Sequence, residues 1–309
     1  MKQDISTRNL ERISNLEIKA KAKSILKNKS PKKTLVADFW VPNIYGIKLW
    51  DCVSLMDIAV FRLSKRDKRE LVSIRYDFRN GDYLKINSGP NGMATIWDYD
   101  IVIILTSYLT ESMNLYHQNK GKIPSRIVTI KVCDILKFSQ KGCGSRQYDE
   151  LEMALDRLKN TTIETIRAPK KGDRITRIAK PEGLINGYTV ESRTKAGKLS
   201  KVSIEIPNWL YKEVTQGPKP HVLTLSPEYF SISSGIDRFI YRLARKSAGT
   251  KPAIWGGKVL HERSFSSGGY NTFSQLTRKA IKKNNLPEFD LQKQQGRNGE
   301  LQLLMQRRK

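Results

Sequence analysis

The stretch that decides the fold begins at residues 231–249, SISSGIDRFIYRLARKSAG, and resumes at residues 268–304, GGYNTFSQLTRKAIKKNNLPEFDLQKQQGRNGELQLL. In the first segment, apolar residues recur at helical spacing: Ile236, Phe239, Ile240 and Leu243. Basic residues fall mostly on the opposite side: Arg238, Arg242, Arg245 and Lys246. This pattern predicts a helix with one buried stripe and a basic outer face. Ser233 or Ser234 can cap its start, and Gly249 lies just past its end.

A second amphipathic helix is expected at about residues 272–284. Its apolar stripe consists of Phe273, Leu276, Ala280 and Ile281. The remaining face, counted from the residues just before the helix, holds polar and basic side chains: Asn271, Thr272, Ser274, Gln275, Arg278, Lys279, Lys282 and Lys283. Such side chains can read base edges and bind phosphates when a helix enters the major groove of DNA. We therefore take them as candidate DNA-binding residues.

The elements around these two helices complete a recognisable series. A short helix is expected at residues 259–263, and the alternation after Pro287 predicts a hairpin with Arg297 at its tip. For one amphipathic helix alone, a small helical domain with a solvated basic face would be the simpler interpretation. The ordered series of helix, short helix, basic helix and hairpin is that of a winged helix-turn-helix, and it favours DNA or RNA binding.

The charge of the chain supports a polyanionic partner. There are 56 Lys and Arg residues against 30 Asp and Glu residues, a formal net charge of +26, far more than solubility requires. The excess is concentrated at the two ends: residues 1–35 carry 10 basic and 3 acidic residues, and residues 221–309 carry 16 and 6. Ribosomal or membrane-surface binding could also use this charge. The Lys-rich segment 1–35 is either a solvated tail or an arm that contacts DNA.

Length and composition restrict the remaining possibilities. A chain of 309 residues suits two domains of ordinary size. No stretch approaches the roughly 18 apolar residues of a membrane span, and the N-terminus lacks the apolar core of a secretory signal. We therefore expect a cytoplasmic protein with no membrane association.

The cysteine and histidine residues give no sign of a metal site. Cys52, Cys133 and Cys143 form no Cys-x-x-Cys pair, so reduced, structural cysteines are expected. His117 and His261 lie far from each other and from His221, without neighbouring ligands at metal spacing. We expect no metal and no cofactor.

The first half of the chain shows the same order of elements. Alternating residues between 56 and 87 predict two or three antiparallel strands, including the segment 58–64. Thr95 and Asp98 resemble a capping box, and the helix that they start should bury an apolar set: Trp97, Ile101, Ile104, Leu105 and Tyr108. Further helices are expected at residues 132–138 and 146–160, followed by a strand at 161–166 and a hairpin within 187–206. This order alone suggests a duplication.

The two candidate reading helices differ in charge. The helix at 146–160 carries four acidic residues: Asp149, Glu150, Glu152 and Asp156. Such a face is poorly suited to lying against phosphates, so the C-terminal helix is expected to dominate DNA affinity. The first half could contact DNA through Ser145, Arg146 and Gln147 at the start of its helix, or could serve mainly in protein contacts.

Several strings resemble the plasmid replication initiator protein A family, whose members carry "LFRLSK"-like and "GMATVWDYD"-like boxes. The matching strings are MDIAVFRLSK at 56–65, GMATIWDYDIVI at 92–103, SRQYDELEMALDRLKNTTIET at 145–165, IPNWLYKEV at 206–214 and SGIDRFIYRLARKSAG at 234–249. The resemblance spans about residues 56–285. It departs at LHERSFSSGGYNTF (260–273), where the family more often shows a Lys-Ser-Gly-Ser-like string.

The resemblance implies two tandem winged-helix domains that bind repeated sites at a plasmid origin, open the adjacent duplex and bring in host replication proteins. Those partners would be a host initiator and the replicative helicase or its loader, and the role would extend to copy control. Together with the patterns above, it predicts an α+β fold with small antiparallel sheets. The expected parts are a basic tail (1–35), an N-terminal winged-helix domain with preceding strands (36–220) and a C-terminal winged-helix DNA-binding domain (221–309). A homodimer is possible.

Two other function classes compete with this interpretation. Asp98 and Asp100 could suggest catalysis, but side chains two apart on a helix face different directions, so Asp98 is better interpreted as a cap and Trp97 as core. The sequence has no His-x-His and no GxxxxGK[ST], which argues against a rolling-circle initiator, helicase or ATPase. We expect no enzymatic activity. The serious alternative is a winged-helix transcriptional repressor, because the same scaffold binds operators as readily as origins.

Overall fold

The computed structural model describes residues 47–66, 68–78, 81–166, 181–195, 197, 199–217, 219–296 and 299–308. All of these residues belong to one compact unit. The basic segment 1–35 and Arg297 lie outside the described residues. The expectations for the tail and for the tip of the last hairpin therefore stay predictions.

The first half contains a helix, a strand, two further helices and a hairpin. These elements are α2 (Asp100–His117), β4 (Ile127–Lys131), α3 (Val132–Phe138), α4 (Ser145–Asn160), β7 (Gly187–Arg193) and β8 (Leu199–Glu205). The three strands form an antiparallel sheet in the order β4-β8-β7. Helix α4 buries Leu151, Leu155 and Leu158, as its apolar spacing predicted.

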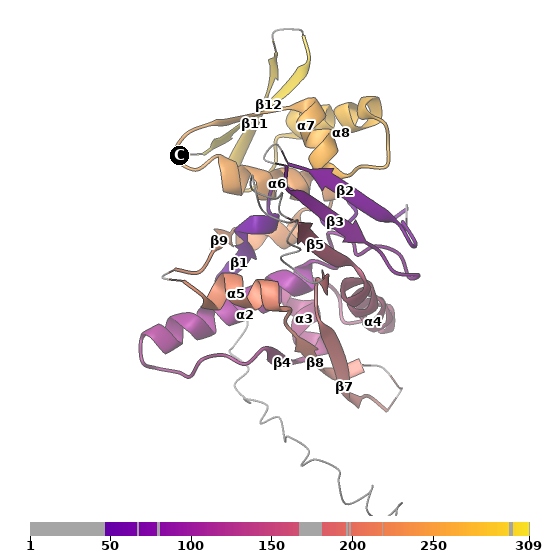
Figure 1. The fold of residues 1–309 in the computed structure, drawn as a ribbon, viewed down its shortest axis with the longest axis vertical. Coiled ribbons are helices and arrows are strands. Elements are labelled where there is room, and N and C mark those ends of the chain that lie inside the picture. Colours follow the sequence, from indigo (N-terminus) through magenta and orange to yellow (C-terminus); the bar gives the residue numbers. More distant parts are fainter. Residues whose placement is uncertain are drawn as a thin grey trace, which may run out of the picture. The chain divides into compact units, whose positions relative to one another are not determined.

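The second half contains the same series. Its elements are α6 (Gly235–Ser247), β10 (Ala253–Gly256), α7 (Gly257–Ser264), α8 (Tyr270–Lys283), β11 (Phe289–Gln295) and β12 (Leu301–Arg307). Its sheet order is β10-β12-β11, so the first strand pairs with the last in both halves. Figure 1 shows α7, α8 and this hairpin together, with α6 between them and the first half. The predicted order of three helices and a hairpin is confirmed in both halves, whereas the strands β4 and β10 between the first two helices were not predicted.

A second sheet of the first half lies outside this series. It has the order β2-β3-β5-β6 and is built from β2 (Ser73–Asp77), β3 (Tyr83–Asn87), β5 (Thr162–Ile166) and β6 (Glu182–Gly183). The strand predicted within residues 58–64 is wrong: only Arg62 makes an isolated bridge there, with Thr95. Residues 58–62 are all buried, because the segment runs through the core and does not expose every second side chain.

A two-stranded sheet links the start of the described chain to its second half. Strand β1 (Leu49–Cys52) pairs antiparallel with β9 (Val222–Leu225). Short elements follow each strand, η2 (Val53–Leu55) after β1 and η3 (Pro227–Ser231) after β9, while α5 (Asn208–Thr215) precedes β9. The pairing spans the expected division at 220/221, and that division itself stays a prediction.

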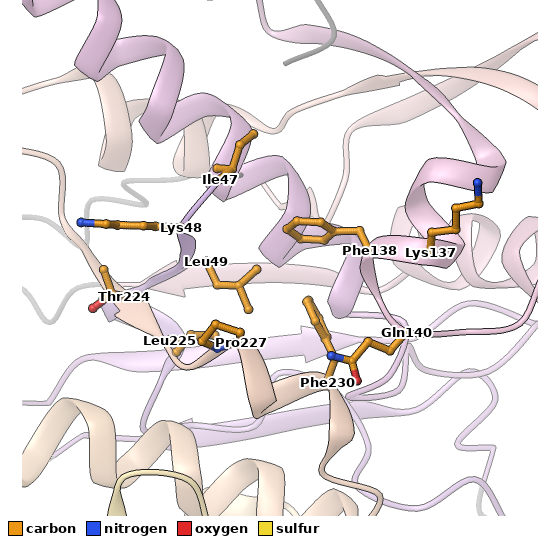
Figure 2. A pocket seen from close by; sticks show the side chains of 10 residues that line it. All are labelled: Ile47, Lys48, Leu49, Lys137, Phe138, Gln140, Thr224, Leu225, Pro227 and Phe230. Carbon is orange, nitrogen blue, oxygen red and sulfur yellow. The ribbon is translucent and has the colours of Figure 1, made fainter. Parts of the chain in front are cut away.

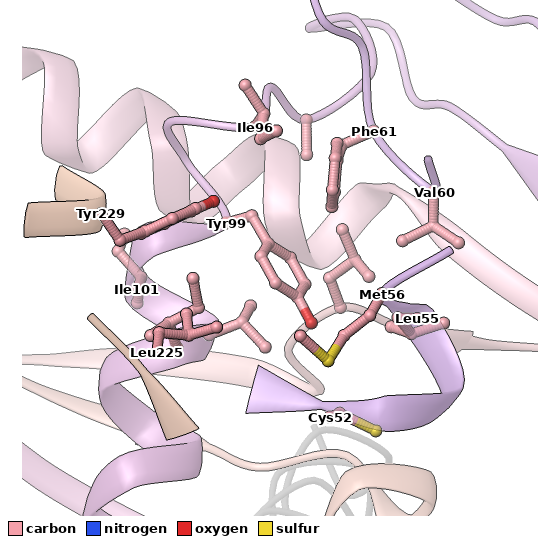
Figure 3. Packing of buried hydrophobic residues seen from close by; sticks show 14 of the residues in the cluster. Cys52, Leu55, Met56, Val60, Phe61, Ile96, Tyr99, Ile101, Leu225 and Tyr229 are labelled. Atoms are coloured by element: carbon pink, nitrogen blue, oxygen red, sulfur yellow. The ribbon is translucent and has the colours of Figure 1, made fainter. Parts of the chain in front are cut away.

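The core is shared by the two halves. Figure 3 shows Phe61 and Tyr99 of the first half packed with Leu225 and Tyr229 of the second. The Phe61 and Tyr99 ring centroids lie 4.8 Å apart, and all four residues are at most 5% exposed. Burial of such large side chains stabilises each by about 1.5–3 kcal/mol. The halves are therefore joined by hydrophobic packing as well as by backbone pairing.

Helix α6 corrects the interpretation of its basic face. Arg238 and Arg242 are 2% and 0% exposed, although their spacing placed them opposite the buried stripe. Arg238 Nη1 donates to Asp100 Oδ1 at 2.6 Å, and Arg242 Nε donates to Asp51 Oδ2 at 2.6 Å. Both carboxylates come from the first half. A buried arginine needs such a partner, and helical periodicity alone cannot show one supplied from elsewhere in the chain.

The reciprocal hydrogen bonds of the predicted capping box are present, but they close the turn before α2, which begins at Asp100 with Tyr99 as its N-cap. Thr95 N donates to Asp98 Oδ2 at 2.8 Å, and Asp98 N donates to Thr95 Oγ1 at 3.0 Å. The Asp98 carboxylate also binds Arg157 through two hydrogen bonds of 2.8 Å, whereas Asp100 pairs with Arg238. The two carboxylates thus point to separate arginines, as the helical spacing indicated. Trp97 and Tyr108 are half-buried, so the expected burial was overstated at these two positions.

Candidate nucleic-acid interface

Helix α8 presents a polar and basic face to solvent. Seven of the candidate residues on and beside the predicted helix are exposed: Asn271, Thr272, Gln275, Arg278, Lys279, Lys282 and Lys283. The buried side is built from Phe273, Thr277 and Ala280. With no acidic residue in its first turn and Lys282 and Lys283 in its last, the exposed side suits contact with phosphates and base edges.

Two residues of α8 lie where the sequence pattern did not place them. Ser274 is only 8% exposed, and its Oγ lies 3.5 Å from Arg278 Nε, so it can orient Arg278 but is not part of the exposed face. Leu276, expected in the apolar stripe, is 40% exposed. Thr277 takes the buried position, because its hydroxyl donates to Phe273 O at 3.0 Å and is thereby satisfied without water.

The turn before α8 is held by the first half. Phe265 adopts a left-handed backbone conformation with φ of 46°, and its carbonyl accepts a hydrogen bond from Arg69 Nη2. Its ring meets the Tyr76 ring edge-on at 5.9 Å. Arg263 pairs with Asp57. This turn belongs to residues 260–273, where the sequence differs from the string that is more common in the family. Its contacts with the first half give these differing residues a structural role.

The remaining hairpin of the second half adds few free cations in its described part. Arg307 and Arg308 pair with Glu288 and Asp290, while Lys293 on β11 is exposed. The Arg308 guanidinium lowers the pKa of the Asp290 carboxyl through a hydrogen bond of 2.8 Å. These two pairs fasten the end of β12 to the segment after α8.

At the start of α4, Ser145 and Arg146 are exposed and Gln147 is half-buried. Arg146 is paired with Glu150 at 2.9 Å. The three candidates of the first half are therefore together in one helical turn. Their surroundings are less basic than those of α8.

The acidic residues of α4 have a structural use. Glu152 binds Arg193 of β7 at 2.7 Å, and Asp156 accepts a hydrogen bond of 2.8 Å from the Tyr188 hydroxyl. Burial, followed by this hydrogen bond, raises the pKa of Tyr188. Two of the four acidic side chains thus attach α4 to its hairpin, which accounts for part of a charge that would be unfavourable on a DNA-facing helix.

A basic loop was missed as a candidate. Residues 65–69 read KRDKR, and Lys65, Arg66 and Lys68 are exposed. The Lys65 ammonium lies 4.9 Å from the centre of the Trp97 ring, and Arg69 reaches the turn before α8. Four basic residues within five positions were the signal in the sequence that could have identified this loop. Its position near α8 could not be predicted from the sequence, because that contact depends on the fold.

A pocket of about 580 Å³ lies elsewhere, between the end of α3 and the β1–β9 pair (Figure 2). The described residues that line it are Ile47, Lys48, Leu49, Lys137, Phe138, Gln140, Thr224, Leu225, Pro227 and Phe230. Carboxylates, histidines and cysteines are missing from this set. The described lining therefore holds no carboxylate, imidazole or thiol, and its ionisable side chains are those of Lys48 and Lys137.

The other described residues that could bind a metal do not form a cluster. Among the described residues no three His, Cys, Asp or Glu side chains lie close enough to hold a metal. The three cysteines are free, with Cys52 buried and Cys143 exposed. In the same part of the chain, no helix combines the length and the apolar character needed to cross a membrane.

Two solved structures share this fold. One holds domains 2 and 3 of RctB as selenomethionine derivatives, with a TM-score of 0.56, 12% identity and coverage of 80% of this chain and 94% of that one. The other, RctB-155-483, also spans domains 2-3, with a TM-score of 0.52, 12% identity and coverage of 81% and 95%. The class is thus a mixed helix and sheet protein with small antiparallel sheets and an RctB-like arrangement.

The family follows from the sequence comparison. Residues 50–291 match the model of the family described as replication initiator protein A, and the chain belongs to that family. A "Putative replication protein" of Wigglesworthia glossinidia brevipalpis is 29% identical over 279 residues, which cover 89% of this chain and 94% of that protein. The resemblance drawn from the five sequence strings is confirmed.

Proposed function

We propose that this protein is a tandem winged-helix initiator of plasmid replication that binds repeated double-stranded DNA sites at an origin. The observation that carries the proposal is the exposed cationic face of α8 in a chain of the replication initiator protein A family. The series of helix, strand, two helices and hairpin in each half supports a winged helix-turn-helix in both, since this is the order that such domains use.

In this proposal α8 enters the major groove and makes the main contacts. Its lysines bind phosphates, while Arg278, Gln275 and Asn271 read base edges. The start of α4 provides a second, weaker contact from the first half. The protein then promotes opening of the adjacent duplex and brings in the host initiator and the replicative helicase or its loader, in the cytoplasm.

We also propose that the protein acts by binding and catalyses no reaction. The sequence lacks a phosphate-binding loop of the GxxxxGK[ST] type, and the described lining of the 580 Å³ pocket offers no carboxylate, histidine or thiol. ATPase and DNA-nicking assays on the purified protein should show no turnover. Turnover that disappears with a single point substitution would contradict this part of the proposal.

The decisive experiment is footprinting on the replicon that encodes the protein. Protection of directly repeated sites beside an AT-rich tract is expected, together with replication of a minimal origin when the protein is supplied in trans. Protection of a lone inverted repeat at a promoter, without replication in trans, would instead identify the alternative, a winged-helix transcriptional repressor. Repression of its own gene is compatible with the initiator role.

A further inference from the structure

Leu276 stands out on the exposed side of α8. It is 40% exposed, and it is the only large hydrophobic residue of this helix that is exposed to that degree. Its outward neighbours one helical turn away are Thr272 and Lys279, both exposed. An apolar side chain is therefore set beside polar and cationic ones.

Packing within the folded protein buries only part of the Leu276 side chain. Leu276 lies three residues after Phe273, at the edge of the buried side of α8, but Thr277 takes the position that faces the core. Much of the Leu276 side chain is therefore left in water. Removing apolar surface from water is favourable, so this exposed part is available for a contact with a partner.

The surroundings indicate the chemistry of that contact. Lys279 and Lys283 share the exposed side of α8 with Leu276 and favour a polyanion, whose phosphates they would bind. The apolar group that duplex DNA exposes in its major groove is the 5-methyl group of thymine, which cytosine lacks. We propose that Leu276 is a specificity-determining residue that packs against a thymine 5-methyl group in each repeat. The inference rests on the proposed function, because it requires α8 to enter the major groove.

The test removes the methyl group without changing base pairing. A repeat located by footprinting is synthesised with each thymine replaced in turn by deoxyuridine, and the affinity of the full-length protein is measured by fluorescence anisotropy. At one position per repeat, affinity should fall about fourfold, the factor that corresponds to burying one methyl group. Leu276→Ala should bind the unmodified repeat more weakly and show no further weakening at that position.

Matched variants separate this contact from a general effect of reduced apolar surface. Leu276→Met keeps an apolar side chain of similar size and should retain the sensitivity to the methyl group. Ile254→Ala removes another exposed apolar side chain, 54% exposed on β10, and should behave like the wild type throughout. Affinity for unrelated DNA should be the same in all variants, because phosphate contacts dominate it.

Three results would overturn the inference. They are specific binding that no deoxyuridine weakens, a methyl effect that persists in Leu276→Ala, and a change in the sedimentation of Leu276→Ala without DNA, which would make Leu276 a contact between copies. In each case specific binding to the repeats would continue, and the proposed function would stand. Failure of the wild type to distinguish the repeats from unrelated DNA would instead contradict the proposed function.

Discussion

Arg242 is a fully buried charge whose position depends on residues far away in the chain. Burial acts to lower the pKa of its guanidinium, but the Asp51 carboxylate outweighs that effect and the pKa is raised. The guanidinium also lies over the rings of Phe61 and Tyr99, 5.0 Å and 4.6 Å from their centres, as cations do in aromatic surroundings. Because Asp51 belongs to the first half, the periodicity of α6 could not reveal that Arg242 points inward.

Replacement of Arg242 should be costly. Arg242→Met leaves the Asp51 carboxylate buried without its cation, and we expect the free energy of unfolding to fall by about 3–5 kcal/mol. Urea denaturation followed by circular dichroism measures this change. Arg307→Met, which breaks an exposed pair with Glu288, is the control and should cost at most about 1 kcal/mol. Equal stabilities for the two variants would disprove the role given to the buried pair.

The cysteines should differ in reactivity according to their burial. Burial, with the nearby Glu213 and Asp51 carboxylates, raises the pKa of Cys52 to about 12, so at pH 8 almost no reactive thiolate is present. Cys143 is exposed. Iodoacetamide at pH 8, followed by mass spectrometry, should modify Cys143 long before Cys52 in the folded protein, and both in urea. Equal rates in the folded protein would refute this expectation.

Helical periodicity predicted the positions of the helices better than it predicted which side of each helix is buried. Residues 132–138 were predicted and found as a helix, and α8 begins and ends within two residues of its expected bounds. Its buried side was less well predicted, because Thr277 satisfies its hydroxyl on the Phe273 carbonyl and so replaces Leu276 inside. Polarity alone does not show which hydroxyls find a partner within their own helix.

Arg278 should contribute to sequence discrimination. It is exposed and has Ser274 Oγ 3.5 Å from its Nε, which suits a side chain that is directed toward a base. We expect Arg278→Ala to weaken binding to the repeat by about 1–3 kcal/mol and to relax specificity if it pairs with guanine. Binding titrations on the repeat and on singly substituted repeats would test this. Unchanged affinity would remove Arg278 from the base-reading set.

The lysines at the end of α8 should act through phosphates alone. Lys282→Ala or Lys283→Ala should weaken binding to the repeat and to unrelated DNA alike. The slope of log affinity against log salt should flatten by about one for each phosphate that the variant no longer binds. Lys212→Ala, which changes an exposed lysine of α5, serves as the control. A variant slope identical to that of the wild type would place the lysine outside the interface.

The two halves of the protein meet closely at Gly235. A Cβ atom placed on this residue would lie 2.1 Å from the Leu63 carbonyl oxygen, so the start of α6 touches the backbone of the first half. The three helices and the hairpin of each half were predictable from local patterns, but the short strands β4 and β10 were not. The contact between the halves was not, since it joins backbone atoms of residues that are far apart in sequence.

Gly235→Ala should therefore separate the halves locally. A backbone oxygen cannot move aside as a flexible side chain can, and we expect a loss of about 1–3 kcal/mol in stability, visible as a lower melting temperature. Gly249→Ala provides the matched control, because a Cβ atom there meets no atom within 4 Å. Similar melting temperatures for the two variants would show that α6 can shift without cost.

The pairing of β1 with β9 has a consequence for synthesis. Residues 49–52 leave the ribosome early, but their partners at 222–225 follow only after most of the chain has been made. At translation rates of roughly 5–20 residues per second, the early strand waits on the order of ten to thirty seconds with an open edge, the condition under which strands pair with the wrong neighbour. Nascent chains released before residue 225 should therefore be the aggregation-prone species during expression.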